Sequence, residues 1–248
     1  MNRSDETVDL LRGYDLWVIQ PRHGYRFSLD PVLLCDFARP SEGTVVDLGT
    51  GCGIIPLLVA RRAPECRIVG VELQGGMVEL ARRNVGLNGL CDRIGIVESD
   101  ILHLGDHLPA NGFDLVLANP PGRRRGEGRV SPRAGRDLAR HESSATLEDF
   151  LVAAKRLVRV GGRVCFIHHP ERLAELFCLA KDVRLAPRRV RMVHGDASAP
   201  ARMFLVELMK GSRGALEVLP PLLVYDGAGG YTDELSRIYG DSSVRLRR

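Results

Sequence analysis

A glycine-rich turn follows the apolar run at 44–48 and offers a place where a ligand could meet the backbone. Its sequence is Gly49-Thr50-Gly51-Cys52-Gly53, with Asp47 two residues before the first glycine. Glycines between a strand and a helix let a ligand approach the free amide groups of the helix start. A dinucleotide site needs glycines at i, i+2 and i+5, but the third position here holds Ile54 or Pro56, depending on the register. The spacing therefore argues against a nicotinamide-dependent dehydrogenase.

Acidic residues follow the next two predicted strands, at the edge where a parallel sheet binds its ligands. Glu72 lies at the end of the run at 67–73, and Asp100 follows the run at 94–98. Together with Asp47 and the glycine turn, these positions resemble those of class I S-adenosylmethionine-dependent methyltransferases. The resemblance implies that Asp47 and the turn hold the methionine half of the cofactor, that Glu72 binds the ribose and that Asp100 binds the adenine amino group.

A carboxylate suits the ribose because it can accept two hydroxyl protons in charge-assisted hydrogen bonds. A lone glycine triplet is more often a plain turn, but the combination on consecutive strand ends favours the cofactor. The residues of this region expected to contact S-adenosylmethionine are Asp47, Gly49, Thr50, Gly51, Cys52, Gly53, Glu72, Leu73, Gln74, Asp100, Ile101 and Asn119.

The predicted strand at 113–118 runs into Asn119-Pro120-Pro121. Two prolines cannot continue a central strand, so the chain leaves the sheet here, and a plain strand terminator is the simplest interpretation. Methyltransferases that modify a planar nitrogen carry Asn-Pro-Pro and then an aromatic residue at this site. By that resemblance, the Asn119 side-chain oxygen and the Pro120 carbonyl accept the two protons of an exocyclic amine and orient its nitrogen toward the methyl group. Asn119, Pro120 and Pro121 are thus the predicted catalytic residues, and no strong base is required.

Seven segments spread over nearly the whole chain carry a more specific resemblance. They are residues 24–30, 47–53, 119–121, 139–142, 146–150, 219–226 and 231–233. With them the chain resembles bacterial methyltransferases that modify the N6 position of an adenosine in the anticodon loop of a valine tRNA. The resemblance implies a tRNA substrate and places Arg26, Ser28 and Asp30 in an N-terminal segment that closes over the cofactor.

One position departs from that family. Gly122 stands where the aromatic residue after Asn-Pro-Pro would stack on the base. Such stacking is worth roughly 1–3 kcal/mol per base, so its loss should weaken adenine binding unless another ring replaces it. Tyr25, Phe27 and Tyr231 are candidates. A different substrate, a non-catalytic protein or stacking by an arginine plane are the other interpretations.

Arginines gather directly after this motif. The chain has a net charge of +4, and only three of its 35 basic residues are lysines, so 32 are arginines. Residues 122–140 hold seven of them against two acids, a local charge of +5. A charge run is often only a solvated loop, but this one flanks the predicted reaction centre and could grip phosphates. The predicted RNA-binding residues are Arg123, Arg124, Arg125, Arg129, Arg133, Arg136 and Arg140.

Short β-branched runs alternate with segments of helical period from residue 44 onward, which is typical of a parallel sheet with crossover helices. We therefore expect an α/β, Rossmann-like class I methyltransferase fold. Its sheet would have seven mostly parallel strands with an antiparallel edge hairpin and helices on both faces. The predicted strands are 44–48, 67–73, 94–98, 113–118, 163–168, 190–194 and 203–209; the predicted helices are 54–62, 77–88, 147–158 and 171–180.

The two ends of the chain do not share this rhythm. Residues 1–40 are interpreted as an N-terminal extension that covers the cofactor site, and 212–248 as a C-terminal extension of the same domain around a core at 41–211. Neither extension is long enough to bury a core of its own.

The composition excludes several classes of protein. With 248 residues, 44% hydrophobic and 27% charged, the chain can bury a sizeable core, so disorder and a disulfide-stapled miniprotein are excluded. No apolar run approaches the roughly 18 residues of a membrane span, and no targeting segment is visible, so a cytoplasmic protein is expected. Six scattered cysteines, with His103 and His107 lacking a nearby third ligand, predict no metal site. The oligomeric state stays open, a homodimer included.

Three hypotheses of function follow. The first is an S-adenosylmethionine-dependent methyltransferase acting on an adenine N6 amine in RNA, with tRNA as the expected partner. The second is transfer to the N5 amide of a glutamine in a protein, which the same Asn-Pro-Pro motif serves elsewhere but which leaves the arginine segment unexplained. The third is a non-catalytic protein that binds RNA or the cofactor.

Overall fold

Strands and helices alternate over most of the chain in the computed structural model, which describes residues 5–23, 26, 28–121 and 145–240. The strands are β1 Glu6–Leu11, β2 Leu16–Pro21, β3 Glu42–Leu48, β4 Glu65–Glu72, β5 Ile94–Glu98, β6 Phe113–Ala118, β7 Val158–His168, β8 Leu185–His194, β9 Ala201–Lys210, β10 Glu217–Val218 and β11 Leu222–Leu223. The helices are α1 Asp30–Ala38, α2 Ile54–Arg62, α3 Gly75–Leu87, α4 Leu147–Leu157, α5 Leu173–Asp182 and α6 Asp233–Tyr239.

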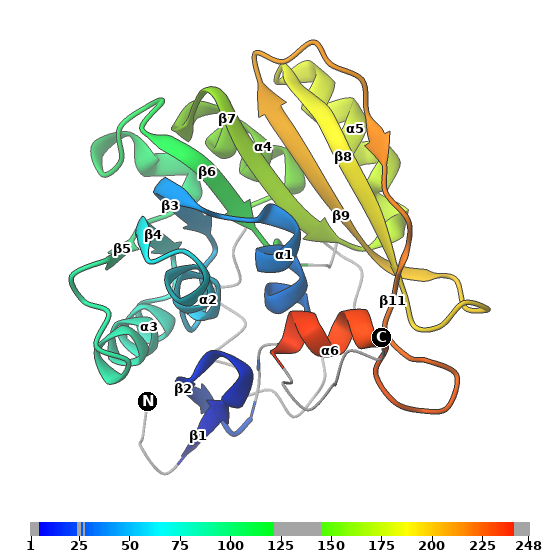
Figure 1. Cartoon of the computed structure of the whole chain (residues 1–248). Coiled ribbons are helices and arrows are strands. Elements are labelled where there is room, and N and C mark those ends of the chain that lie inside the picture. Colours follow the sequence, from blue (N-terminus) through cyan, green and yellow to red (C-terminus); the bar gives the residue numbers. More distant parts are fainter. Residues whose placement is uncertain (1–4, 24–25, 27, 122–144, 241–248) are drawn as a thin grey trace, which may run out of the picture.

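One large sheet organises these elements (Figure 1). Its strand order is β10-β8-β9-β7-β6-β3-β4-β5, and β11 also pairs with β8. The pairs from β5 to β7 are parallel, whereas β9 is antiparallel to both β7 and β8. The mixed α/β fold with an antiparallel hairpin is therefore confirmed. The prediction of seven strands omitted β10 and β11, because a two-residue strand carries no periodicity.

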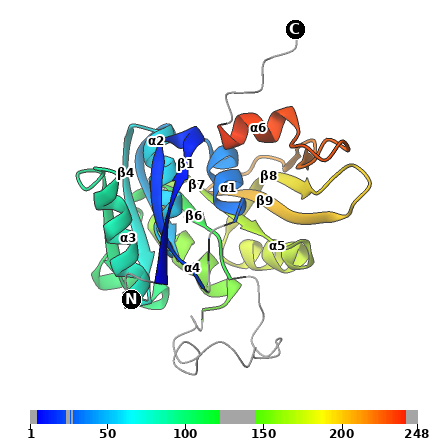
Figure 2. The same ribbon diagram turned by 90° about the horizontal axis from the view of Figure 1, so that it is seen from below.

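Apolar side chains of the central strands alternate between the two faces of the sheet, as strands buried on both sides require. In β3, Val45 belongs to the core shared with α1, α2 and α3, whereas Val46 and Leu48 belong to the core shared with α4 and α5. Figure 2 shows α1 and α6 on one side of the sheet and α4 and α5 on the other. The helices thus cover both faces, and the ends of the parallel strands stay free to build a site.

The first forty residues lack the alternating pattern of the core in the sequence, but β1, β2 and α1 lie there. Two asparagines, Asn84 in α3 and Asn88 directly after it, hold β2 in place. The Asn84 side chain is fully buried; its Oδ1 accepts from the Ile19 N–H (2.7 Å), and its Nδ2 donates to the carbonyls of Ile19 (3.0 Å) and Cys52 (2.9 Å). One turn later, Asn88 pairs with the backbone of Trp17 in the same way (2.9 and 2.7 Å). The two amides therefore act on β2 as a neighbouring strand would.

The predicted boundaries are correct for α2, β5 and β6 and differ by a few residues elsewhere. The largest differences are at the starts of β7 and β8, which begin at Val158 and Leu185 rather than at 163 and 190. The register of β7 against β6 also shifts, between Phe113 and Leu115. Among the described helices, none is long and apolar enough to cross a membrane. The division at residues 41 and 212 stays a prediction.

We expect Asn84→Ala to lower the free energy of unfolding by about 2–4 kcal/mol, because it leaves three buried backbone groups without a partner. Chemical denaturation monitored by circular dichroism measures this change. Asn88→Ala is the matched control, and because its partners lie near the surface it should cost about 1 kcal/mol or less. Equal losses in the two variants would contradict the role given to Asn84.

Candidate active site

The glycine turn between β3 and α2 has a backbone that only glycine adopts readily. It is fixed to the neighbouring strand because the N–H groups of Gly49 and Thr50 both donate to the Val71 carbonyl (2.9 Å each). Phe150 of α4 lies 3.6 Å from where a Gly49 side chain would begin, so the turn is also covered from the other face. Three of its residues have positive φ: Gly49 (74°), Gly51 (56°) and Gly53 (84°).

Asp47 lies at the end of β3 beneath this turn and is fully buried. Neither of its carboxylate oxygens, nor the buried Thr50 hydroxyl, makes a well-formed hydrogen bond to a described residue, although the Thr50 hydroxyl lies close enough to act on the Asp47 charge. Burial raises the pKa of the Asp47 carboxyl to about 7; the Thr50 hydroxyl opposes this rise, and the charge of Glu72 adds a smaller contribution to it. Buried acceptors without a hydrogen bond lower the stability of the folded protein. Here they are suited to bind a cationic ligand, such as the ammonium group of a methionine.

Glu72 connects the glycine turn to the start of α3. Its carboxylate is buried and accepts three backbone hydrogen bonds, from Gly51 at Oε2 (2.9 Å) and from Leu73 and Gln74 at Oε1 (2.9 Å each). A carboxylate offers about four acceptor positions, so Oε2 retains one and Oε1 none. This geometry leaves room for one ribose hydroxyl bond rather than the two expected from the sequence.

Asp100 caps a short 3-10 helix at Ile101–Asp106, with its Oδ1 accepting from the Leu102 N–H (3.0 Å). The capping bond fixes the direction of the half-buried carboxylate, and Ile101 packs against the α4 face of the core. Cys52 is buried too. Its backbone carbonyl accepts a hydrogen bond from the Asn84 side chain (2.9 Å), which connects the glycine turn to α3.

A cavity of about 170 Å³ opens beside Asn119 at the end of β6. The Asn119 side chain is half-buried and makes no hydrogen bond to any other described residue. The cavity brings the predicted catalytic residues together with the N-terminal segment. Its lining consists of Arg26, Ser28, Asp30, Asn119, Pro120, Pro121, His168, His169 and Met203.

The N-terminal residues of this cavity are held by the chain around them. The Arg26 guanidinium donates to Asp9 (2.7 Å) and Thr7 (2.8 Å) of β1, and the Ser28 hydroxyl accepts from the Asp30 N–H (3.3 Å) at the start of α1. The structure thus places all three in the cavity beside Asn119.

Comparisons with known proteins show the family of the chain. The sequence model of the methyltransferase small domain family matches residues 30–177, which is more than half of the chain. The chain belongs to this family. The protein is therefore an S-adenosylmethionine-dependent methyltransferase, as the sequence predicted.

Sequence relatives support the activity, and solved structures support the fold. Proteins named tRNA1(Val) (adenine(37)-N6)-methyltransferase from Porphyromonas gingivalis and Aeromonas hydrophila are 31% and 30% identical, each over 86% of this chain and over 86% and 87% of their own length. A predicted O-methyltransferase from Agrobacterium tumefaciens shares the fold (TM-score 0.70, 24% identity, 85% of this chain and 95% of that one). TrmN from Thermus thermophilus matches over 73% of this chain and 48% of its own (TM-score 0.52, 26% identity). The resemblance to the tRNA adenine-N6 methyltransferases is thus confirmed.

Sequence reasoning missed two rings of the methyltransferase, His168 and His169, which follow one another at the end of β7. His168 is buried and stacks on Phe204 with ring centroids 6.5 Å apart; its Nδ1 accepts from the His169 N–H (2.8 Å). Burial, together with the charge of Arg172, lowers the pKa of His168 to about 4, so the ring is neutral at pH 7. The sequence signal was the pair of histidines at a strand's carboxyl end, where ligands bind.

One ring that was predicted as a base-stacking candidate lies away from the described lining of this cavity. Tyr231 stacks with Tyr225 (5.8 Å between centroids) and contacts Tyr239 (6.3 Å), so the structure does not place it beside Asn119. Tyr25, Phe27, Gly122 and the seven arginines at 123–140 lie outside the residues that the structure describes. Their predicted roles stay predictions. No three His, Cys, Asp or Glu side chains among the described residues gather in a group that could hold a metal ion.

Proposed function

We propose that this methyltransferase transfers the methyl group of S-adenosylmethionine to the N6 amine of an adenine in tRNA. The observation that carries the proposal is the Asn119 side chain, which makes no hydrogen bond to another described residue and lies beside Pro120 in a cavity at the carboxyl edge of the sheet. The relatives named as tRNA1(Val) (adenine(37)-N6)-methyltransferases, which match over 86% of this chain, support tRNA as the substrate. That substrate would place the activity in the cytoplasm.

The residues around the glycine turn would hold the cofactor, which supplies an electrophilic methyl group when bound. Asp47 and Thr50, whose buried oxygens make no well-formed hydrogen bond to the described residues, would accept hydrogen bonds from the ammonium group. The open position on Glu72 Oε2 would accept one ribose hydroxyl, and Asp100 would bind the adenine amino group. The positive-φ glycines keep side chains out of the space that the cofactor needs.

Asn119 and Pro120 would act on the substrate by orientation. The lone pair of an adenine amine is delocalised into the ring, so the amine is a poor nucleophile. When the Asn119 Oδ1 and the Pro120 carbonyl accept its two protons, the nitrogen is held with its lone pair toward the methyl group. His168 lines the same cavity and is neutral at pH 7. A protonated His168 would repel the sulfonium cation of the cofactor, and the neutral ring does not.

His169 would supply the ring that Gly122 lacks. Its half-buried imidazole lines the Asn119 cavity. His169 is far from Asn119 in the sequence, so the Asn-Pro-Pro motif alone does not point to it. Stacking on an aromatic face tolerates any flat ring, so an imidazole can serve where a phenyl group is usual.

We expect the wild-type protein to transfer a radiolabelled methyl group to bulk tRNA from cells that lack the gene. Asn119→Ala should lower this transfer by at least about a hundredfold, because the amine loses the acceptor that orients it. Nuclease digestion and chromatography should place the label in N6-methyladenosine. Label that survives ribonuclease and stays with protein would favour the glutamine-amide alternative, and no label in any acceptor would overturn the proposal.

We also expect His169→Ala to raise the KM for tRNA by roughly tenfold, because the target base loses one stacking contact. His169→Phe, which keeps a flat ring, should restore most of the affinity. Steady-state kinetics with methylation-free tRNA measures both variants. An unchanged KM in His169→Ala would show that another group, such as an arginine plane, stacks on the base.

A further inference from the structure

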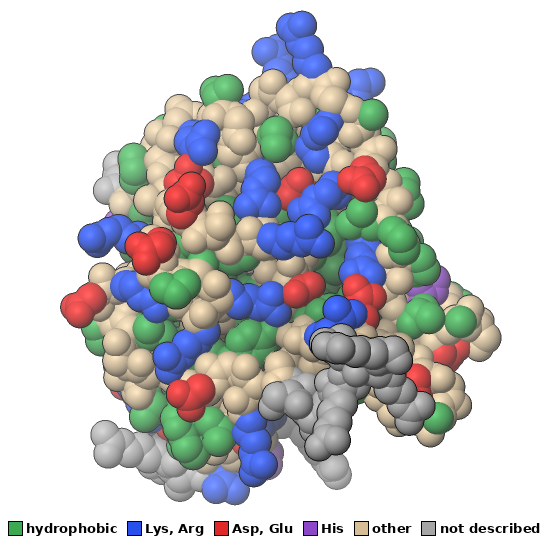
Figure 3. Space-filling view, viewed as in Figure 1, with side chains coloured by type: hydrophobic (Ala, Val, Ile, Leu, Met, Phe, Trp, Pro, Cys, Tyr) green, Lys and Arg blue, Asp and Glu red, His purple; other side chains and the backbone are tan. Residues whose placement is uncertain are grey.

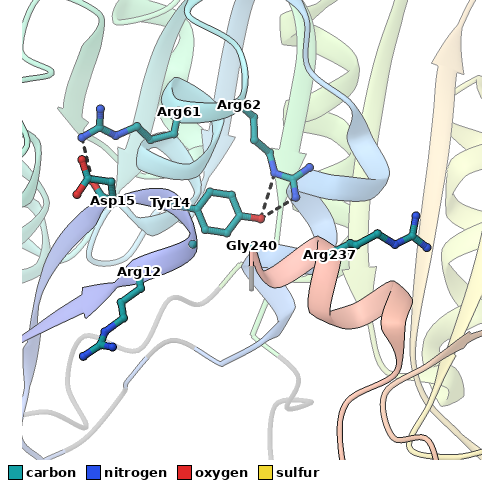
Figure 4. Close-up of a pocket in the computed structure, with 8 residues that line it drawn as sticks. Arg12, Tyr14, Asp15, Arg61, Arg62, Arg237 and Gly240 are labelled. Carbon is teal, nitrogen blue, oxygen red and sulfur yellow. Dashed lines mark hydrogen bonds between the residues drawn. The ribbon is translucent and has the colours of Figure 1, made fainter. Parts of the chain in front are cut away.

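A second cavity, of about 520 Å³, lies apart from the methyl-transfer site. Its walls come from the connection between β1 and β2, the C-terminal end of α2 and the end of α6 (Figure 4). The helix α2 starts at the glycine turn, and Arg61 lies eight residues further on, which is about 12 Å along the helix axis. The lining holds four arginines against one acid, Asp15.

One of these arginines is structural. The Arg62 guanidinium donates to the Tyr14 hydroxyl (2.6 Å), to Asp36 (2.9 Å) and to the Ile238 carbonyl (3.1 Å). The Tyr14 hydroxyl in turn donates to the same Ile238 carbonyl. Arg62 therefore ties α1, α2, α6 and the β1–β2 connection together and gives the cavity a fixed floor.

The walls are also fixed by a close backbone contact. A side chain at Gly13 would begin 2.6 Å from the Gly240 Cα and 2.3 Å from the Tyr239 carbonyl oxygen. Gly240 itself has a φ of 77°, which favours glycine. Only two glycines allow α6 to end so close to the β1–β2 connection, so the cavity is formed before any ligand arrives.

The other three arginines are exposed and keep donors to spare. Arg61 uses one N–H group on the Asp15 backbone carbonyl (2.9 Å), and Arg237 uses its Nε on the Asp233 carbonyl (3.2 Å). No partner within the described residues is recorded for the Arg12 guanidinium. Figure 4 shows the three at separate points around Tyr14 rather than converging on one spot.

Helix ends explain these arginines only in part. Arg61 and Arg237 lie in the last turns of α2 and α6, where a cation is favoured by the helix dipole. That effect does not account for Arg12, nor for the gathering of all three around one preformed cavity. Lys and Arg side chains are also spread over the face that carries α1, α2 and α6 (Figure 3). Asp and Glu side chains lie among them, so the three separated guanidinium groups, rather than the face as a whole, point to the ligand, and they suit a chain of phosphates better than a single small anion.

We infer that Arg12, Arg61 and Arg237 form a second RNA contact, which binds backbone phosphates of the tRNA away from the target adenine. The inference rests on the proposed function, because it takes the tRNA to be the ligand. Guanidinium groups can donate two parallel hydrogen bonds to a phosphate, and each phosphate they neutralise releases counterions. The contact would fix how the tRNA lies on the protein while its base enters the Asn119 cavity.

The test compares two triple variants in tRNA binding by filter retention over a range of potassium chloride concentrations. R12Q/R61Q/R237Q should bind tRNA at least about tenfold more weakly, and the slope of log affinity against log salt should fall by about 2–3. R67Q/R184Q/R213Q is the matched control, because it removes three exposed arginines outside the cavity. The control should keep its affinity within about twofold and its slope within about 1.

Thermal melting and S-adenosylhomocysteine affinity, both expected to match the wild type, verify that the variants fold. Equal losses in the two triple variants, or wild-type binding by R12Q/R61Q/R237Q, would overturn the inference. Pyrophosphate binding is measured on the same two triple variants. If R12Q/R61Q/R237Q loses pyrophosphate binding but keeps the wild-type tRNA affinity, the inference is overturned and the cavity is a site for small anions. A wild-type protein that binds tRNA through this cavity but methylates none would overturn the proposed function and leave the RNA contact standing.

Discussion

The methyl-transfer site depends on one unusual constraint, a fully buried carboxylate that makes no well-formed hydrogen bond to any of the described residues. Asp47 lies under the glycine turn with a pKa of about 7, and the Thr50 hydroxyl beside it also makes no well-formed hydrogen bond to a described residue. The surrounding contacts hold it there: β3 is enclosed by β4 and β6, the turn is bonded to Val71, and Phe150 covers the other face. A protein keeps such a costly group when a ligand offsets the cost, and we propose that the cofactor's ammonium does so.

Much of this framework was predictable from the sequence, because it rests on local patterns. Short β-branched runs placed the central strands, and helical period placed α2. The N-terminal elements were not predictable, since their anchoring by Asn84 and Asn88 joins residues far apart in the chain. Two-residue strands such as β10 carry no period at all.

Part of the candidate site was likewise predictable from the sequence, and part was not. The glycine turn, the acids and Asn119 stand out because their types and spacing repeat a family pattern. His168 and His169 carried a weaker signal, their place at a strand's carboxyl end, and only the pairing of β7 with β6 shows that they share a cavity with Asn119. The bonds that leave Glu72 only one open acceptor position depend on the backbone geometry of two turns, which spacing does not specify. The arginine cavity joins three distant segments and is a property of the fold alone.

The most direct test of this account is the number of protons released when S-adenosylhomocysteine binds, measured by titration calorimetry in buffers of different ionisation enthalpy. With a pKa of about 7, Asp47 is partly protonated in the free protein, and a cation beside it lowers that pKa. The account predicts a release of about half a proton per cofactor at pH 7, little release at pH 8, and none in Asp47→Asn, which should also bind more weakly. Binding without proton release at pH 7, or the same release from Asp47→Asn, would contradict it.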